Sequence, residues 1–318
     1  MIVKRFSKIF FDPCSGALDL VYRNAVFFIL PFLFIALFSC TKQENVLTKV
    51  KLDVLFLGHK GGGNTTFSDF YIENTLPSIK YGLEGMNGIE VDVQMSLDGT
   101  LWIYHNPDFM RTCCTPNYSH ALVLLRDTDI EKLQICDGTL TDRVYKLEEV
   151  FDYWKNGPEK FPFSLHLKVD QTVDTLNHPL IGGKVAYLSK FADNLAKIFP
   201  PVSSNDTAMI EIYNAAFLKK IKTLIPSLKV CCDLEGDFTN LVDLAIKGGY
   251  HGISASFNAE SISASEVKRA RDNGLIVQLW TPDLKQDLID AYLLKPTFIQ
   301  TNNMYGAIIC EPYYVPAK

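Results

Sequence analysis

Two carboxylates stand two positions apart in the stretch GIEVDVQ, which runs from Gly88 to Gln94. The stretch is otherwise mostly apolar and is typical of a β-strand, in which residues two apart share one face. Glu90 and Asp92 would then point into a fold interior, where repulsion and lost solvation make the pair costly. A hard divalent cation such as Mg²⁺ or Ca²⁺ takes oxygen ligands, so the pair predicts a metal site. The alternative is a half-exposed strand whose acids face water.

Two histidines end neighbouring β-segments. The apolar run VLFLG (54–58) leads into His59, Lys60 and Gly61, and the run LWIYH ends in His105. Strand ends converge at one mouth of a parallel barrel, so both imidazoles are expected beside the carboxylates. One histidine can take a proton from a nucleophile while the other gives one to a leaving oxygen. The metal and Lys60 would neutralise phosphoryl oxygens, which favours cleavage of a phosphate ester over two merely structural histidines.

The elements that must position these residues alternate along the chain. Apolar runs that predict strands lie at residues 54–58, 88–105, 163–169, 208–214, 227–234, 251–256, 275–280 and 297–302. The run 88–105 is predicted to form two strands, GIEVDVQ and LWIYH, joined by an Asp-Gly turn. Amphipathic stretches typical of helices separate them, which indicates parallel βαβ units. Eight such units match a (β/α)8 TIM barrel of about 250 residues, and no glycine-rich nucleotide-binding turn follows the first strand. We therefore predict an α/β fold with a single barrel domain over residues 52–318.

The first part of this region resembles the glycerophosphodiester phosphodiesterase family. The runs GHKGGG, IENTLPSIKYGLEGMNGIEVDVQ and DGTLWIYHN, between residues 58 and 106, have the order and spacing of that family's signature. Weaker similarity continues through KLEEVF (146–151), LHLK (165–168), WTPD (280–283) and IQTNN (299–303). The resemblance implies a metal-dependent barrel hydrolase that spans nearly all of the chain beyond its N-terminal segment.

The resemblance also implies roles for the matching positions that would act on the substrate. His59 and His105 would be the acid–base pair, and Lys168 would contact the substrate phosphate together with Lys60. Trp280 would line the pocket. Lys168 could instead be a surface charge and Trp280 part of the barrel core, although alternation places Lys168 on the same strand face as His166.

The metal ligands implied by the resemblance are Glu73, Glu90 and Asp92. Glu73 could instead be an acid in the first turn of a helix, favoured by the helix dipole. His166 stands where the family has a metal-binding Glu, so it would add an imidazole that suits Mn²⁺ or Zn²⁺ beside the expected Ca²⁺ or Mg²⁺. It could also bind a substrate phosphate directly.

Three other departures from the family pattern are visible. Lys60 replaces an Arg, which keeps the charge but loses the two-pronged contact to phosphate. Asn106 and Asn302 each replace an acid. These changes leave the substrate and the metal open, together with the level of activity.

A targeting segment precedes the predicted barrel. Four basic residues are followed by AVFFILPFLFIALFS, a run of fifteen residues that ends just before Cys40. Such a run is short for a membrane span of about 20 residues but fits a signal peptide, and LFSC resembles a bacterial lipobox. We predict a signal peptide at residues 1–39, lipidation of Cys40, a lipid-anchored linker at 40–51, and export to the bacterial envelope, at the outer membrane or the periplasmic face. An anchor helix that is never cleaved is the alternative.

Cysteine usage agrees with export. The six cysteines beyond Cys40 show no CxxC spacing, so a cysteine zinc site is not predicted. In an oxidising compartment Cys113 or Cys114 could pair with Cys136, whereas Cys231 and Cys232 lie in an apolar strand and are expected to be buried thiols. The formal charge of −5 and the lack of a basic stripe give no support to a nucleic-acid partner.

These features together predict an enzyme that hydrolyses a small phosphodiester, releasing an alcohol and glycerol 3-phosphate from a glycerophosphodiester. One alternative is a barrel of the phospholipase C or D type that acts on a lipid headgroup, including the phosphatidylinositol-specific and sphingomyelinase types. Cyclic phosphate products would distinguish it. Another alternative is a catalytically weak lipoprotein that binds a phosphorylated ligand.

Overall fold

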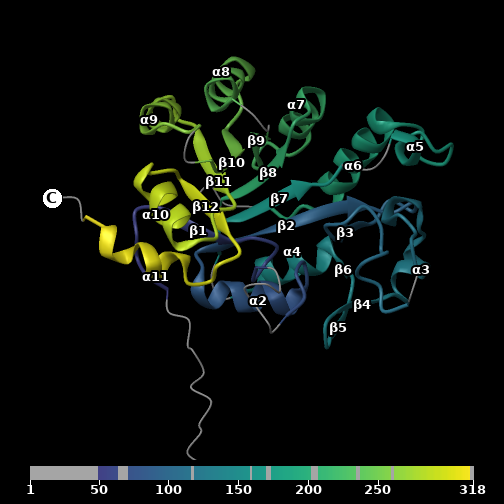
Figure 1. The fold of residues 1–318 in the computed structure, drawn as a ribbon. Coiled ribbons are helices and arrows are strands. Elements are labelled where there is room, and N and C mark those ends of the chain that lie inside the picture. Colours follow the sequence, from purple (N-terminus) through teal and green to yellow (C-terminus); the bar gives the residue numbers. More distant parts are fainter. Residues whose placement is uncertain are drawn as a thin grey trace, which may run out of the picture. The chain divides into compact units, whose positions relative to one another are not determined.

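Eight parallel strands close into a barrel in the computed structural model (Figure 1). In barrel order they are β1 (Leu55–Gly58), β2 (Gly88–Met95), β7 (Phe163–Leu167), β8 (Ala208–Ile212), β9 (Lys229–Asp233), β10 (Gly252–Ser256), β11 (Ile276–Trp280) and β12 (Phe298–Thr301). The barrel closes because β1 pairs in parallel with both β12 and β2. The predicted single (β/α)8 barrel is confirmed.

The residues that the structure describes are 49–63, 71–115, 118–157, 160–169, 173–201, 207–233, 237–258 and 261–315. The predicted signal peptide and Cys40 lie outside them. Among the described residues no helix has both the length and the apolar character needed to cross a bilayer.

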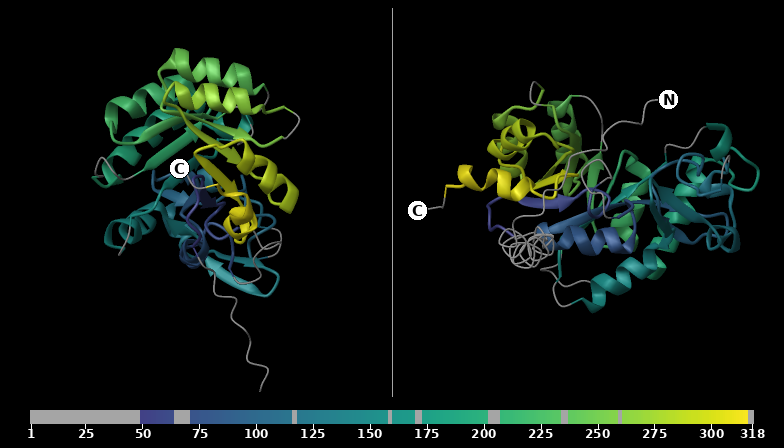
Figure 2. Two further views of the ribbon diagram at one scale, coloured as in Figure 1. Left: turned by 90° about the vertical axis from the view of Figure 1, so that its left-hand side faces the viewer. Right: turned by 60° about the horizontal axis from the view of Figure 1, so that its bottom comes forward.

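A helix follows each barrel strand and packs on the outside of the barrel (Figure 2). These helices are α2 (Leu76–Gly85), α4 (Leu147–Asn156), α6 (Lys184–Ile198), α7 (Ala215–Leu224), α8 (Phe238–Gly248), α9 (Ala264–Asp272), α10 (Lys285–Leu293) and α11 (Gly306–Cys310). Val91 and Val93 of β2 join a buried apolar cluster with Val150 and Trp154 of α4. Because strand side chains alternate, this outward packing turns the carboxylates of β2 into the barrel.

The connection between β2 and α4 carries additional elements at one side of the barrel (Figure 1). β3 (Leu101–Ile103) returns antiparallel to β2, and β6 (Tyr145–Lys146) pairs antiparallel with β3. Between them lie η1 (Leu122–Leu124), α3 (Asp127–Ile130) and the hairpin of β4 (Gln134–Asp137) and β5 (Leu140–Arg143). The short helices α5 (Val173–Leu176) and η2 (Glu311–Tyr313) complete the described elements. The predicted pair of strands in the segment 88–105, joined by a turn at Asp98 and Gly99, is confirmed, and its second strand β3 lies beside the barrel strand β2.

A disulfide fastens this additional region. Of the two partners that the sequence left open, Cys114 forms the bond to Cys136. Cys231 and Cys232 are buried free thiols, as predicted. The bond therefore ties the β4–β5 hairpin to the segment that follows His105.

Candidate active site

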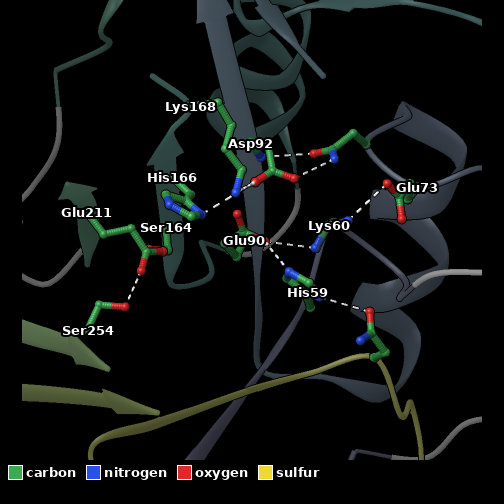
Figure 3. Close-up of polar contacts among 12 residues, drawn as sticks. His59, Lys60, Glu73, Glu90, Asp92, Ser164, His166, Lys168, Glu211 and Ser254 are labelled. Atoms are coloured by element: carbon green, nitrogen blue, oxygen red, sulfur yellow. Dashed lines mark hydrogen bonds and ion pairs between the residues drawn. The ribbon is translucent and has the colours of Figure 1, made fainter. Parts of the chain in front are cut away.

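Glu90 and Asp92 lie next to each other inside the barrel, and neither side chain is exposed (Figure 3). Glu90 Oε2 accepts a hydrogen bond from the backbone N–H of Lys60 at 2.9 Å, and Asp92 Oδ2 accepts one from Asn74 Nδ2 at 2.8 Å. Glu90 Oε1 and Asp92 Oδ1 are buried without a hydrogen bond from the described residues. Burial and the charges of Asp92 and Glu211 raise the pKa of Glu90 well above its usual value. Unbonded acceptor atoms on a repelling pair fit the donor set of a divalent cation.

The next barrel strand places two nitrogen-bearing side chains against Asp92. His166 Nδ1 and Lys168 Nζ each lie 3.5 Å from Asp92 Oδ1, because the parallel register sets Asp92 opposite His166. Burial raises the pKa of Asp92, but the contact with the His166 ring and the charge of Lys168 outweigh it and hold the pKa well below its usual value. His166 and Lys168 therefore share one strand face, as alternation predicted.

A second carboxylate lies on the far side of His166. Asp233 Oδ2, at the end of β9, is 3.4 Å from His166 Nε2. Burial lowers the pKa of His166, but the contacts with the carboxylates of Asp233 and Asp92 outweigh it and raise the pKa well above the usual value. The imidazole is therefore held between two acids.

Three of the four predicted metal ligands come together. Ligand atoms of Glu90, Asp92 and His166 all lie within 4.8 Å of one another, which is close enough to hold one metal ion. Glu73 is not in this group, because its Oε1 contacts Lys60 Nζ at 3.0 Å. Lys60 has a left-handed backbone (φ 55°) and directs its side chain toward Glu73 (Figure 3).

His59 is fixed by a chain of side chains from the last barrel strand. Its Nδ1 is 2.9 Å from Asn302 Oδ1, while Asn302 Nδ2 donates to Asp283 Oδ2 at 2.7 Å. A carboxylate only accepts hydrogen bonds, so Asp283 holds the amide of Asn302 with its oxygen toward His59. Nδ1 of His59 therefore carries the proton, and Nε2 faces Glu90 Oε2 at 3.9 Å with a free lone pair. Burial and the charge of Lys60 lower the pKa of His59 to about 3.

His105 reaches the same mouth by a different route from the predicted one. It follows β3, which runs back along β2, and Tyr104 N–H donates to the backbone oxygen of Asp92 at 3.0 Å. His105 Nδ1 lies 2.9 Å from Asn106 Oδ1. A charge on His105 contributes to the lowered pKa values of His59 and Asp92, so His105 is within electrostatic reach of both.

The glycines after Lys60 allow the chain to approach the neighbouring strands closely. Gly61 N–H donates to the backbone oxygen of Glu90 at 2.9 Å, with a left-handed φ of 92°. Gly63 has a φ of 84°, and a Cβ atom there would lie 2.3 Å from the backbone oxygen of Asn302. Only glycine fits this position without strain or clash, so the run GHKGGG serves to seat His59 against β12.

Comparison with known proteins identifies the family. The model of the "Glycerophosphoryl diester phosphodiesterase family" matches residues 59–303, which is most of the chain. The chain belongs to this family. Its members are phosphoric diester hydrolases, so the site is that of an enzyme.

Individual relatives are distant in sequence. A protein named glycerophosphodiester phosphodiesterase from Caldanaerobacter subterraneus is 22% identical over 245 residues, covering 74% of this chain and 89% of its own. Among solved structures, an Oleispira antarctica phosphodiesterase in complex with the product sn-glycerol-3-phosphate has a TM-score of 0.61 at 16% identity, covering 80% of this chain and 96% of its own. A glycerophosphodiester phosphodiesterase from Parabacteroides distasonis has a TM-score of 0.60 at 16% identity, covering 83% of this chain and all of its own. These structures share the fold.

A further buried acid, Glu211, lies close enough to Glu90 to raise its pKa. Glu211 of β8 accepts hydrogen bonds from Ser164 Oγ at 2.8 Å, from Gln278 Nε2 at 2.8 Å and from Ser254 Oγ. Trp280, the predicted pocket residue, ends β11 and is partly exposed, and its buried indole N–H has no hydrogen-bond partner among the described residues. The charge of Glu211 contributes to the raised pKa of Glu90. Trp280 lies at the mouth end of its strand.

Sequence reasoning assigned no role to Asn74, Asp233, Asp283 and Glu211. Asn74 and Asp283 belong to the quoted runs IENT and WTPD, so the family resemblance was the available signal for them. Glu211 lies two positions after Met209, and Asp233 lies two positions after Cys231, in apolar strands. Alternation along each strand was therefore the local signal that these acids point into the barrel. Neither pattern states which residue across the barrel the side chain will meet.

Proposed function

We propose that this protein is a metal-dependent phosphodiesterase that hydrolyses glycerophosphodiesters to an alcohol and glycerol 3-phosphate. The observation that carries the proposal is the position of His59, whose Nε2 lone pair faces Glu90 Oε2 at 3.9 Å while its Nδ1 is held by Asn302. The product named for the Oleispira relative, sn-glycerol-3-phosphate, supports the substrate class.

In this proposal His59 is the general base. Its lowered pKa keeps the imidazole neutral at physiological pH, so Nε2 can accept a proton from the attacking nucleophile. His105, at the same mouth, donates a proton to the oxygen of the leaving alcohol. Lys168 and Lys60 supply positive charge for the phosphoryl oxygens as negative charge develops on them.

Glu90, Asp92 and His166 would hold the divalent metal ion. The buried, unbonded acceptor atoms of Glu90 and Asp92 and the mutual distances of all three residues fit such an ion. When bound, the ion polarises a phosphoryl oxygen and stabilises the charge that develops there. Oxygen ligands favour Ca²⁺ or Mg²⁺, and the imidazole of His166 also suits Mn²⁺ or Zn²⁺.

Release of glycerol phosphate from glycerophosphocholine and glycerophosphoinositol tests the proposal. The purified protein is treated with EDTA, and Mg²⁺, Ca²⁺, Mn²⁺ or Zn²⁺ is then restored, beside a His59→Ala variant. Release that needs both a metal and His59 is expected. A cyclic phosphate product would instead favour the phospholipase type, and no release with any ion from folded protein would favour a ligand-binding role.

We also propose that the enzyme is exported and anchored by lipid at Cys40. The N-terminal sequence supports this, and the Cys114–Cys136 disulfide is typical of an oxidising compartment. Mass spectrometry of the N-terminus of protein from membranes should find a lipid-modified Cys40, and Cys40→Ser should leave residues 1–39 attached. An unmodified Cys40 in membrane-bound protein would contradict lipidation.

A further inference from the structure

Asp233 contacts the one metal-ligand candidate that is not a carboxylate. Its Oδ2 lies 3.4 Å from His166 Nε2, while His166 Nδ1 faces Asp92 Oδ1 at 3.5 Å. The side chain of Asp233 is only 15% exposed. We infer that Asp233 is a positioning residue that orients His166 so that Nδ1 is its ligand atom. This inference rests on the metal dependence proposed above.

The chemistry of the two groups gives Asp233 this role. A carboxylate accepts hydrogen bonds but does not donate them, so the imidazole nitrogen that faces Asp233 must carry hydrogen. In His166 that nitrogen is Nε2. The lone pair of Nδ1 is then available to a cation that takes the place of the proton on Nδ1. Histidines that bind metals commonly donate their other N–H to a carboxylate, which fixes both the tautomer and the ring orientation.

Strand register explains why Asp233 can reach His166. His166 of β7 pairs with Glu211 of β8, and Glu211 pairs with Cys231 of β9. Asp233 is two residues beyond Cys231, so it lies on the same inner face and nearer the C-terminal end of its strand. It approaches His166 from across β8, on the side of the ring away from Asp92.

A double-mutant cycle on metal binding tests whether Asp233 acts through His166. Mn²⁺ is the probe, because it accepts both oxygen and nitrogen ligands and its free form is counted by electron paramagnetic resonance. The full chain is compared as wild type, Asp233→Asn, His166→Gln and the double variant. Asp243→Asn is the control, since Asp243 is an exposed partner of Arg269 on the outer helix α8.

Loss of a carboxylate behind a metal-binding histidine typically weakens metal affinity by about 10–100-fold, and we expect such a loss in Asp233→Asn. In the His166→Gln background, Asp233→Asn should cause a loss of Mn²⁺ affinity that is smaller by a factor of at least about five. A smaller loss in that background is the signature of coupled residues. Equal losses in both backgrounds would mean that Asp233 binds the ion itself or acts by charge alone, and would overturn the inference. Unchanged affinity in Asp233→Asn would also overturn it.

A spectroscopic readout is independent of these affinities. Pulsed electron paramagnetic resonance of bound Mn²⁺ should show coupling to an imidazole nitrogen in the wild type and none in His166→Gln. Absence of that coupling in the wild type would overturn the inference. Both measurements are made without substrate, so failure to hydrolyse glycerophosphodiesters would leave their result standing. If the wild type hydrolyses glycerophosphodiesters but Asp233→Asn binds Mn²⁺ as the wild type does, the role of Asp233 is overturned and the proposed function stands.

Discussion

Asn302 has a single orientation because Asp283 accepts hydrogen bonds from both its backbone and its side-chain nitrogen, at 2.8 and 2.7 Å. Replacing Asp283 with Asn removes this constraint, because an amide can both donate and accept. We expect kcat to fall by about tenfold or more, a part of the 10²–10⁴ that general base catalysis contributes, while KM changes little. Steady-state kinetics beside the exposed control Asp272→Asn measures this.

The tautomer of His59 gives a second readout for the same substitution. Nitrogen-15 NMR should show the proton on Nδ1 in the wild type and a mixture of tautomers in Asp283→Asn. A wild-type spectrum with the proton on Nε2 would contradict the proposed orientation of the base.

The protonation of His59 gives a pH prediction. Its pKa in the folded protein is lowered from 6.5 to about 3, by burial and by the charge of Lys60. The unfolded chain therefore binds a proton that the folded chain does not, so this residue lowers the free energy of unfolding as pH falls from about 6.5 toward 3. NMR titration between pH 5 and 8 should leave the His59 signals, assigned with His59→Gln, unmoved. A titration midpoint near 6.5 would refute the buried, neutral base.

At the scale of elements, the glycine loop between β1 and α2 holds the base against β12. Alanine at Gly63 would place its Cβ 2.3 Å from the backbone oxygen of Asn302 and would adopt a left-handed φ. We expect a loss of about 1–3 kcal/mol in the free energy of unfolding and at least about a tenfold loss of activity, because His59 and Asn302 are pushed apart. Chemical denaturation and turnover assays measure the two effects.

Gly274→Ala is the matched control for this loop. Gly274 also has a left-handed φ, 76°, but a Cβ there meets nothing within 4 Å. The control should therefore show the backbone strain without the loss of activity. Equal activity losses in Gly63→Ala and Gly274→Ala would show that the close approach to β12 is not what holds the base.

The elements were predictable where the signal is local. Alternation within one strand placed Glu90 with Asp92, and His166 with Lys168, on shared faces, and the series of strands and helices predicted the barrel. The individual partner that a side chain meets across the barrel was not predictable, since His59 and Asn302 are 243 positions apart and meet only because the barrel closes. The ion pair of Lys60 with Glu73 depends on a left-handed backbone at Lys60, which residue types alone do not indicate. The Asp-Gly turn before Leu101–Ile103 was a local signal as well, and it correctly predicted that this strand pairs with β2.

At the scale of the whole molecule, the carboxylate pair couples metal binding to stability. Burial, together with the charges of Asp92 and Glu211, raises the pKa of Glu90 and so makes its ionised form unfavourable. Glu90→Gln should therefore raise the melting temperature in EDTA, since it removes repulsion while an amide oxygen can still accept from Lys60 N–H. With metal the order should reverse, because an ion at 100 times its Kd adds about 2.7 kcal/mol to the wild type. Thermal denaturation with and without Mn²⁺ measures this, and equal melting temperatures under all conditions would contradict it.

The closure of the barrel through β1 has a consequence for synthesis. His59 lies at the end of the first barrel strand, whereas Asn302, which orients it, directly follows the last one. A chain still growing on the ribosome can contain both histidines, the acids of β2 and the additional region, yet lack the residue that fixes the base. The enzyme can therefore gain full activity only after residue 302 has been made, and chains that end before it should be inert even where most of the barrel is present.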